Sequence, residues 1–286
     1  MLALISQHII STKRQSTVIS SVRNATWNFQ LLRKKLERKC VQTVSDITIL
    51  DEPEVDLIDY MGTDADICDA ARVSTNANVT ISDIAKDRGL INYLMEHKHG
   101  SPFEHNSMKF YVKAPIFVFR EFHRHRIGFS YNEMSGRYTE LPADFYVPSL
   151  KRPLVNFGTS ARPEYRLPQG EEEINEHARL HMIVNTDFID VYTFAWEKYK
   201  HMLSEGIAKE VARDVLPVGI YSQMYVTCNA RSLMHFLSLR IEDLSARYPS
   251  HPLYEIQQVA LKMEELFKNQ FPITYAMFIK NGRVAP

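Results

Sequence analysis

The chain has few of the features that mark several common classes of protein. It contains three cysteines, Cys40, Cys68 and Cys228, and no CxxC pair. Their number and spacing indicate neither a disulfide framework nor a zinc site, so a reducing compartment is the simplest environment for the chain. No apolar run approaches the roughly 20 residues that span a bilayer. We therefore expect a cytoplasmic protein without a membrane partner.

Neither sign of charge predominates. Lys+Arg and Asp+Glu both total 34, which gives a formal net charge of zero. A protein that coats DNA or RNA needs a standing positive field, so nucleic acid is not the expected partner. A neutral chain still permits a local basic pocket for one phosphate, and low net charge favours association between copies.

The N-terminal residues are the exception to this balance. The first 45 residues contain one acid, Glu37, and many basic residues: Lys13, Arg14, Arg23, Arg33, Lys34, Lys35, Arg38 and Lys39. This composition is compatible with an organelle transit peptide, with a basic tail, or with a helix over about 27–41. We treat residues 1–44 as a basic extension and 45–286 as one folded domain.

Hydrophobic periodicity predicts mixed secondary structure. Apolar spacing predicts helices over 81–97, 171–203, 230–239 and 254–267, and alternation predicts strands over 108–112 and 221–227. Pro115 suits the first turn of a further helix that runs towards His125. Residues 148–170, rich in Pro and Gly, predict a long loop, which we hypothesise to be a lid. This order of elements favours an α+β fold with a mixed or antiparallel central sheet packed against helices.

The segment RHRIGFSYNEMSGRY (124–138) is unusually dense in polar and charged residues. Arginine presents a planar fork that suits phosphate or imide oxygens. The Ser-Gly-Arg run at 135–137 offers a hydroxyl, an unobstructed backbone N–H and a guanidinium, which together predict an anion cradle. If Arg124 and Arg126 lay on one helix they would point about 200° apart. Either the helix ends before them or they bind different ligands; a solvated basic turn is the other interpretation.

A second cluster is HKHGSPFEH (97–105). Its three histidines, with Glu104 close by, are compatible with metal binding. No further Cys or acid follows at matching spacing, and Pro102 interrupts the geometry. A hydrogen-bonded turn is the other interpretation.

The third cluster is NARSLMHFLSLR (229–240). Asn229 is a residue type that caps helices. Arg231 and His235 are four residues apart and share a helix face, whereas Arg240 points away from them. We therefore expect Arg240 to contact a different group. A capped helix with surface charges is the alternative interpretation.

Taken together, the three clusters resemble the flavin-dependent thymidylate synthase family. The block RHRIGFSYNEMSGRY is similar to that family's signature, and HGSPFEH, AKEVARDVLP (208–217) and NARSLMHFLSLR resemble its other blocks in the same order. The resemblance covers about 64–260. One departure is that eight residues, rather than the usual seven, separate Arg126 from Ser135. We expect the extra residue to bulge the loop, which leaves the placement of Phe129 and Ser130 open.

The resemblance implies a homotetramer-forming α+β catalytic domain at 45–286 whose active sites are shared between subunits. It implies reductive methylation of dUMP to dTMP, with methylenetetrahydrofolate as one-carbon donor and FAD, reduced by NADPH, as hydride carrier. Such enzymes do not need the nucleophilic cysteine of the other thymidylate synthases. None of the three cysteines is in a Pro-Cys setting, and Cys228 is interpreted as buried packing.

The resemblance also assigns roles to particular residues. Arg240 would contact the uracil imide, and His99 would lie near the reacting ring or the folate. Ser135 is a catalytic candidate, but we prefer a binding role for it because no histidine lies in its segment to activate it. The dUMP site would comprise Glu121, Arg124, Glu133, Met134, Ser135, Gly136, Arg137, Arg213 and Arg240. The FAD site would comprise Ser101, Glu104, Arg124, His125, Arg126, Glu133, Asn229, Arg231 and His235. No metal ligand is assigned.

Two alternatives belong to other classes. A metal phosphohydrolase would use His97, His99 and His105 as ligands and the arginines as phosphate clamps, and a chelator would abolish its activity. A nucleic-acid-binding module would use the basic N-terminus and the RHR segment, and its binding would depend steeply on salt. The neutral charge and the four ordered blocks weigh against both.

Overall fold

The computed structural model describes residues 42–44, 46–75 and 84–286. Contacts divide the chain into two compact units, one containing 148–187 and the other containing 41–147 with 188–286. The basic extension lies outside the described residues except for its last three positions, so the interpretations of it stay predictions. No helix in the described ranges is long and apolar enough to cross a membrane.

The larger unit is built on a four-stranded antiparallel sheet with the order β3-β4-β7-β5. Its strands are β3 (Glu54–Met61), β4 (Ser107–Pro115), β5 (Phe129–Glu133) and β7 (Tyr221–Cys228). Every second residue of β4 is buried, from Met108 to Ala114, because successive side chains point to opposite faces of a sheet. The predicted strands over 108–112 and 221–227 are therefore confirmed.

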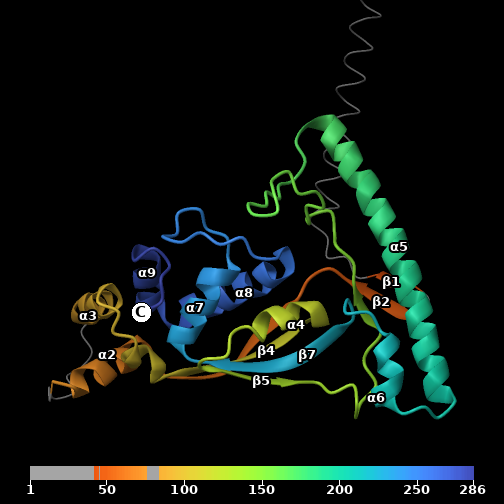
Figure 1. Ribbon diagram of the computed structural model, residues 1–286. Helices are drawn as coiled ribbons and strands as arrows, with labels where there is room; N and C mark the ends of the chain where they lie inside the picture. The colour runs from red at the N-terminus through yellow and green to blue at the C-terminus, as the bar shows by residue number, and fades with distance from the viewer. Residues whose placement is uncertain (1–41, 45, 76–83) are drawn as a thin grey trace, which may run out of the picture. The chain divides into compact units, whose positions relative to one another are not determined.

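Helices cover one face of this sheet (Figure 1). They are α4 (Ile116–Phe122), α7 (Ala230–Arg240) and α8 (Tyr254–Gln270). Their apolar side chains form the main core together with those of β4 and β7, and Phe119, Phe236 and Phe267 are almost fully buried there. The remaining helices are α2 (Asp64–Val73), α3 (Ile84–Glu96), α6 (Lys209–Ala212) and α9 (Pro272–Lys280), with short 3-10 turns η1 (Ser101–Glu104) and η2 (Arg213–Val215).

A second, three-stranded sheet has the order β1-β2-β6. Strands β1 (Gln42–Val44) and β2 (Ile47–Leu50) are antiparallel, whereas β2 and β6 (Asp144–Tyr146) are parallel. The C-terminal half of α5 (Gly170–Ser204) packs here, with the ring of Tyr192 stacked on that of Phe145 at 4.8 Å. The α+β class with mixed strand directions is confirmed, but the strands form two sheets rather than one central sheet.

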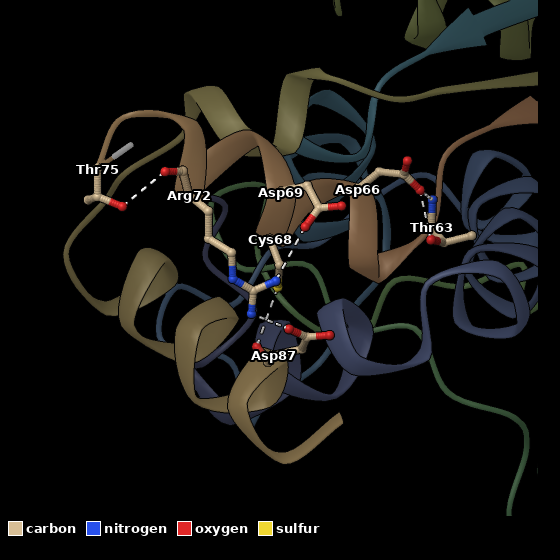
Figure 2. A network of polar contacts seen from close by, with 7 residues as sticks. All are labelled: Thr63, Asp66, Cys68, Asp69, Arg72, Thr75 and Asp87. Atoms are coloured by element: carbon tan, nitrogen blue, oxygen red, sulfur yellow. Dashed lines mark hydrogen bonds and ion pairs between the residues drawn. The ribbon is translucent and has the colours of Figure 1, made fainter. Parts of the chain in front are cut away.

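Polar contacts cap α2 and join it to α3 (Figure 2). Thr63 and Asp66 form a capping box at the start of α2. At its last turn, Arg72 binds Asp87 of α3 at 2.5 Å and Asp69 at 3.3 Å. Asp87 is 2% exposed, so its carboxylate depends on this arginine for neutralisation. The network holds the start of α3 in place, and the other end of α3 leads directly into the histidine cluster at 97–105.

Some predicted boundaries changed. Helix α4 ends at Phe122 instead of running to His125, and Pro115 is the last residue of β4 rather than a first-turn residue. The predicted helices over 171–203, 230–239 and 254–267 are confirmed to within a few residues, and α3 begins at Ile84, the first described residue after 75. Residues 148–169 contain no helix or strand, as predicted for a loop. Its role as a lid stays a prediction.

Candidate active site

Arg240, the last residue of α7, is held by two elements that precede it by more than a hundred residues. Its Nη1 binds the Glu121 carboxylate at 2.7 Å, and its Nη2 donates to the Glu121 carbonyl at 3.3 Å. Its Nε donates to Nε2 of His125 at 3.1 Å. The side chain is 16% exposed. Nε and Nη2 each donate one hydrogen bond to protein and Nη1 forms an ion pair, so at least two of the five N–H groups have no hydrogen-bond partner in the described ranges.

His125 is neutral in this arrangement. Because its Nε2 accepts a hydrogen bond from Arg240, its proton is on Nδ1. Burial, then Arg240, then His235 lower the pKa of His125 to about 4. The imidazole packs on the ring of Phe236 at 4.9 Å. It can therefore orient Arg240 as an acceptor while it offers Nδ1–H as a donor.

The RHR turn follows the end of α4, so Arg124 and Arg126 are not on one helix. Both side chains are exposed, and neither binds any part of the chain that the structure describes. The hydroxyl of Tyr131 donates towards the carbonyls of Phe122 and His125, at 2.8 and 2.7 Å, and so fixes the turn. Arg124 and Arg126 are therefore unpaired within the described ranges, solvent-exposed cations that flank the buried His125 in the sequence.

The extra residue between Arg126 and Ser135 does not bulge the strand. Strand β5 pairs with β7 in continuous register from Phe129 to Glu133, so the pairing of Phe129 and Ser130 is regular. The unusual geometry lies just before the strand, at Gly128, whose φ is +69°. A Cβ at Gly128 would overlap the hydroxyl of Ser232. Glycine is therefore required there by both conformation and space.

A second group gathers around Arg231 in the first turn of α7. Its Nη1 binds Glu104 at 2.6 Å, and its Nε donates to the carbonyl of Pro286 at 2.8 Å. A Cβ on Gly100 would lie 2.5 Å from the guanidinium carbon, so the loop backbone lies directly against the arginine. Ser101 is an exposed residue of the same turn. As expected from their spacing, Arg231 and Arg240 contact different groups.

The start of α7 is fixed independently of these charges. The Asn229 side chain accepts from the Ser232 N–H at 2.9 Å, which confirms the predicted cap. The Asn106 side chain accepts from the Ala230 N–H at 2.7 Å. Both bonds satisfy helix N–H groups that have no partner inside the helix. His235, one turn further on, is exposed, with its ring 6.0 Å from that of His125.

A third group follows the other end of β5. The backbone N–H of Met134 donates to the Gln223 carbonyl at 2.9 Å and leads into the Ser-Gly-Arg run. Arg137 donates its backbone N–H to the Ser135 hydroxyl at 3.3 Å, and its guanidinium binds Glu210 at 3.0 Å. A Cβ on Gly136 would lie 3.2 Å from the side chain of Arg213, so these two residues are adjacent. The Arg213 guanidinium binds no group in the described ranges.

The predicted residues fall into groups at the two ends of the pairing between β5 and β7. The group at 135–137 begins where Met134 meets Gln223, whereas the Arg231 and His125 groups lie near Cys228, where β5 begins. Gln223 and Cys228 are five positions apart on β7, which corresponds to about 17 Å between their Cα atoms.

The histidines at 97–105 do not form a metal site. His97 stacks on Tyr93 with ring centroids 4.1 Å apart, and the rings of His97 and His99 are 6.4 Å apart. Within the described ranges, no group of three or more His, Cys, Asp or Glu side chains could hold a metal ion. His99 is exposed beside the Arg231 group.

The buried cysteines are unsuited to nucleophilic catalysis. Cys68 and Cys228 are free and buried, as interpreted for Cys228. Burial, together with nearby Asp87, raises the pKa of the Cys68 thiol to about 12, and burial also raises that of Cys228. The thiolate is the reactive form, so neither group is activated.

Several contacts in these groups were not predicted from the sequence. They are Tyr131, Asn106, Glu210 and the carbonyl of Pro286. The Asn106 side chain follows a block already singled out, but its partner is a backbone N–H far along the chain. A carbonyl that acts as an acceptor has no signal in a sequence, since every residue carries one.

The fold and these groups define an enzyme-like α+β protein with glycine-lined, cationic sites for anionic ligands. A family model described as "Thymidylate synthase complementing protein" matches residues 56–273. The chain is 50% identical to a flavin-dependent thymidylate synthase of Streptomyces coelicolor over 250 residues, 86% of this chain and 96% of the relative. It is 45% identical to that of Tropheryma whipplei strain Twist over 251 residues, 87% and 99% of the two chains.

The structural comparison agrees. A UMP/dUMP methylase, PolB from Streptomyces cacaoi, crystallised with 5-Br UMP, matches with a TM-score of 0.74 and 44% identity over 84% of this chain and all of that one. The chain belongs to the flavin-dependent thymidylate synthase family. The predicted activity, methylation of dUMP to dTMP with FAD, NADPH and methylenetetrahydrofolate, is thereby confirmed.

The residues present fit an anionic flavin and a nucleotide phosphate. Arg124 and Arg126 are exposed cations without a protein partner, and the nearby backbone at Gly128 has no room for a side chain. Arg213 is a half-buried cation without a partner in the described ranges, and its side chain lies against Gly136. This donor set suits pyrophosphate and phosphate oxygens.

Proposed function

We propose that each dUMP site is assembled from two copies of this chain. The separation of the site residues along β7 carries the proposal. One copy would supply the phosphate cradle, Ser135, Gly136, Arg137 and Arg213, with Glu133 and Met134 beside it. A second copy would supply Arg240, Glu121 and Arg124 at the base. A closed symmetric assembly, such as a homotetramer, places different patches of identical chains together and so completes every site.

Electrostatic stabilisation is the role of Arg240. The uracil C5 becomes nucleophilic only when electron density moves into the ring, and negative charge then develops on the imide. The two free N–H groups of Arg240 would donate to that charge, while Glu121 and His125 keep the guanidinium in one orientation. Ser135 would bind phosphate, since no histidine in the described part of the chain hydrogen-bonds its hydroxyl.

The flavin would be held by the residues near Cys228. Arg124 and Arg126 would bind its phosphates, and Asn229, Arg231 and His235 of α7 would line the site with Ser101 and Glu104. His99, exposed at the same turn, would face the reacting ring or the folate. When bound, reduced FAD supplies hydride and methylenetetrahydrofolate supplies the carbon unit. The chain's own contribution is orientation, exclusion of water and charge stabilisation.

Subunit mixing tests the shared site directly. Arg240→Met and Arg213→Met proteins, each assayed alone, should form almost no dTMP. If the two proteins are unfolded and refolded together in equal amounts, random pairing should restore about one quarter of the sites. Return of activity in the mixture supports the proposal. Two inactive variants that stay inactive together, although they co-assemble, would show that Arg240 and Arg213 serve one site within one chain.

A further inference from the structure

Two non-glycine residues in the described ranges adopt positive φ angles, Lys98 at 60° and Arg283 at 57°. This left-handed conformation is uncommon for such residues, and it persists only where surrounding contacts enforce it. Both residues lie at the same junction. Lys98 Nζ donates to the carbonyl of Ala285 at 3.4 Å, and Arg231 Nε donates to that of Pro286. Figure 1 shows the chain's last residues beside α9, near α3 and α7.

The segment after α9 is firmly anchored. Gly282 N–H donates to the Ile279 carbonyl and Arg283 N–H to that of Phe278, the bonding pattern of a Schellman motif. Arg283 is 6% exposed, and its Nη2 lies 2.7 Å from Glu264 of α8. The Gly282 carbonyl accepts from the Arg247 N–H at 3.0 Å. The direction of the following residues is therefore determined by Arg283 and its partners.

The segment after α9 limits the orientation of the Arg231 guanidinium from one side. Glu104 binds Nη1, the Pro286 carbonyl binds Nε, and the Gly100 backbone lies against the guanidinium. Two of the five N–H groups are thus used by protein, and three remain for a ligand. An arginine whose orientation is already fixed loses less conformational entropy when it binds an anion.

We propose that residues 283–286 are part of the flavin site. The carbonyl of Pro286 orients Arg231 towards the anionic part of the flavin, and Arg283 is a positioning residue that acts through this segment. The Ala285 carbonyl holds Lys98, next to His99, in the same way. The inference rests on the proposed function in one respect, the contact between Arg231 and the flavin.

The test is a titration of full-length apoprotein with FAD, followed by quenching of flavin fluorescence. Four proteins are compared: the parent, a variant that lacks residues 285–286, Arg231→Met, and the combination. Deletion should raise the Kd for FAD at least about tenfold. It removes the charge-assisted hydrogen bond from Arg231 Nε to residue 286, which orients the guanidinium towards the flavin. It should add little in the Arg231→Met background, because the lost carbonyl acts through that side chain. A general loss of structure would instead be additive.

Substitutions at Arg283 guard against a folding defect. Arg283→Met should weaken FAD binding, and Arg283→Lys, which keeps a cation beside Glu264, should recover part of the loss. Lys280→Met is the matched control, since Lys280 also ends α9 but contacts Asn92 instead of the flavin group. Its Kd for FAD should match that of the parent, and thermal melting verifies that each variant is folded.

The outcomes separate this inference from the proposed function. Unchanged or tighter FAD binding after deletion, with weaker binding in Arg231→Met, overturns the inference alone. A deletion effect that adds fully to that of Arg231→Met also overturns it. If Arg231→Met binds FAD like the parent, the assignment of Arg231 to the flavin fails, and the inference fails with it.

Discussion

The role of Arg240 can be tested by replacing it with methionine, which keeps the length of the side chain and removes every donor. Its guanidinium binds Glu121 and His125, and at least two N–H groups remain for uracil. Each hydrogen bond to a charged group contributes about 1.5–3 kcal/mol, so losing both costs about 3–6 kcal/mol. Because each 1.4 kcal/mol is about a tenfold change, kcat/KM for dUMP should fall by about 10²–10⁴.

The assay is anaerobic conversion of dUMP to dTMP with enzyme whose FAD content has been matched by absorbance. The fold should survive, since Glu121 is 35% exposed and can be hydrated when its partner is removed. Arg179→Met is the matched control: Arg179 also binds a glutamate, Glu176, at 2.7 Å, but it is 59% exposed on α5. Its kcat/KM should stay within about twofold of the parent, since exposed ion pairs contribute about 0–1 kcal/mol.

Arg240→Met with near-parental kcat/KM and full FAD occupancy would refute this reasoning. A second signature accompanies the loss of activity. Because Arg240 helps to lower the pKa of His125, that pKa should rise in Arg240→Met, which NMR titration of the imidazole measures. It should stay below the ordinary value of histidine, since burial is the larger cause.

Three further predictions concern stability. Gly128→Ala should lower the melting temperature and FAD affinity together, because it adds a methyl group to a left-handed residue that already touches α7; normal values for both would contradict this close packing and the place of Gly128 beside the flavin site. The lowered pKa of His125, about 4, means that the unfolded chain binds more protons between pH 6.5 and 4. Stability should therefore fall as the pH drops through this range, and less so in His125→Gln, as melting curves would show. Asp87→Asn should cost about 3–5 kcal/mol in urea unfolding, because it leaves Arg72 without its buried partner, whereas Asp69→Asn, which removes the exposed partner, should cost under about 1 kcal/mol.

The sequence predicted best those elements whose pattern is local. Strand β4 alternates strictly between apolar and polar residues, and its bounds were nearly correct. Asn229 capped α7 as its residue type indicated. Strand β5 was missed because its five residues, FSYNE, lie inside a motif that reads as a ligand-binding loop. The irregular backbone expected near the extra residue lies at Gly128, before the strand begins, and the strand itself is regular.

The motifs named a candidate set of site residues, whose roles stay predictions, and gave no information on their arrangement. The motifs identified Arg240, Arg231 and Arg213, but motif order says nothing of distance. The separation follows from the antiparallel register of β5 with β7, which depends on pairing between residues about a hundred positions apart. The contacts with carbonyls at 285 and 286 likewise depend on how α9 closes against α8. Such long-range contacts leave no periodic trace in a single sequence.

The distribution of site residues along β7 has a genetic consequence. If each dUMP site is shared between two subunits, as proposed, one subunit contributes its phosphate cradle to one site and its base-binding residues to another. A cell that produces intact and defective copies would then assemble mixed oligomers. In these, a site that combines an intact half from one subunit with a defective half from its neighbour would be inactive. Alleles that damage opposite ends of the strand would complement each other, whereas alleles that damage the same end would not.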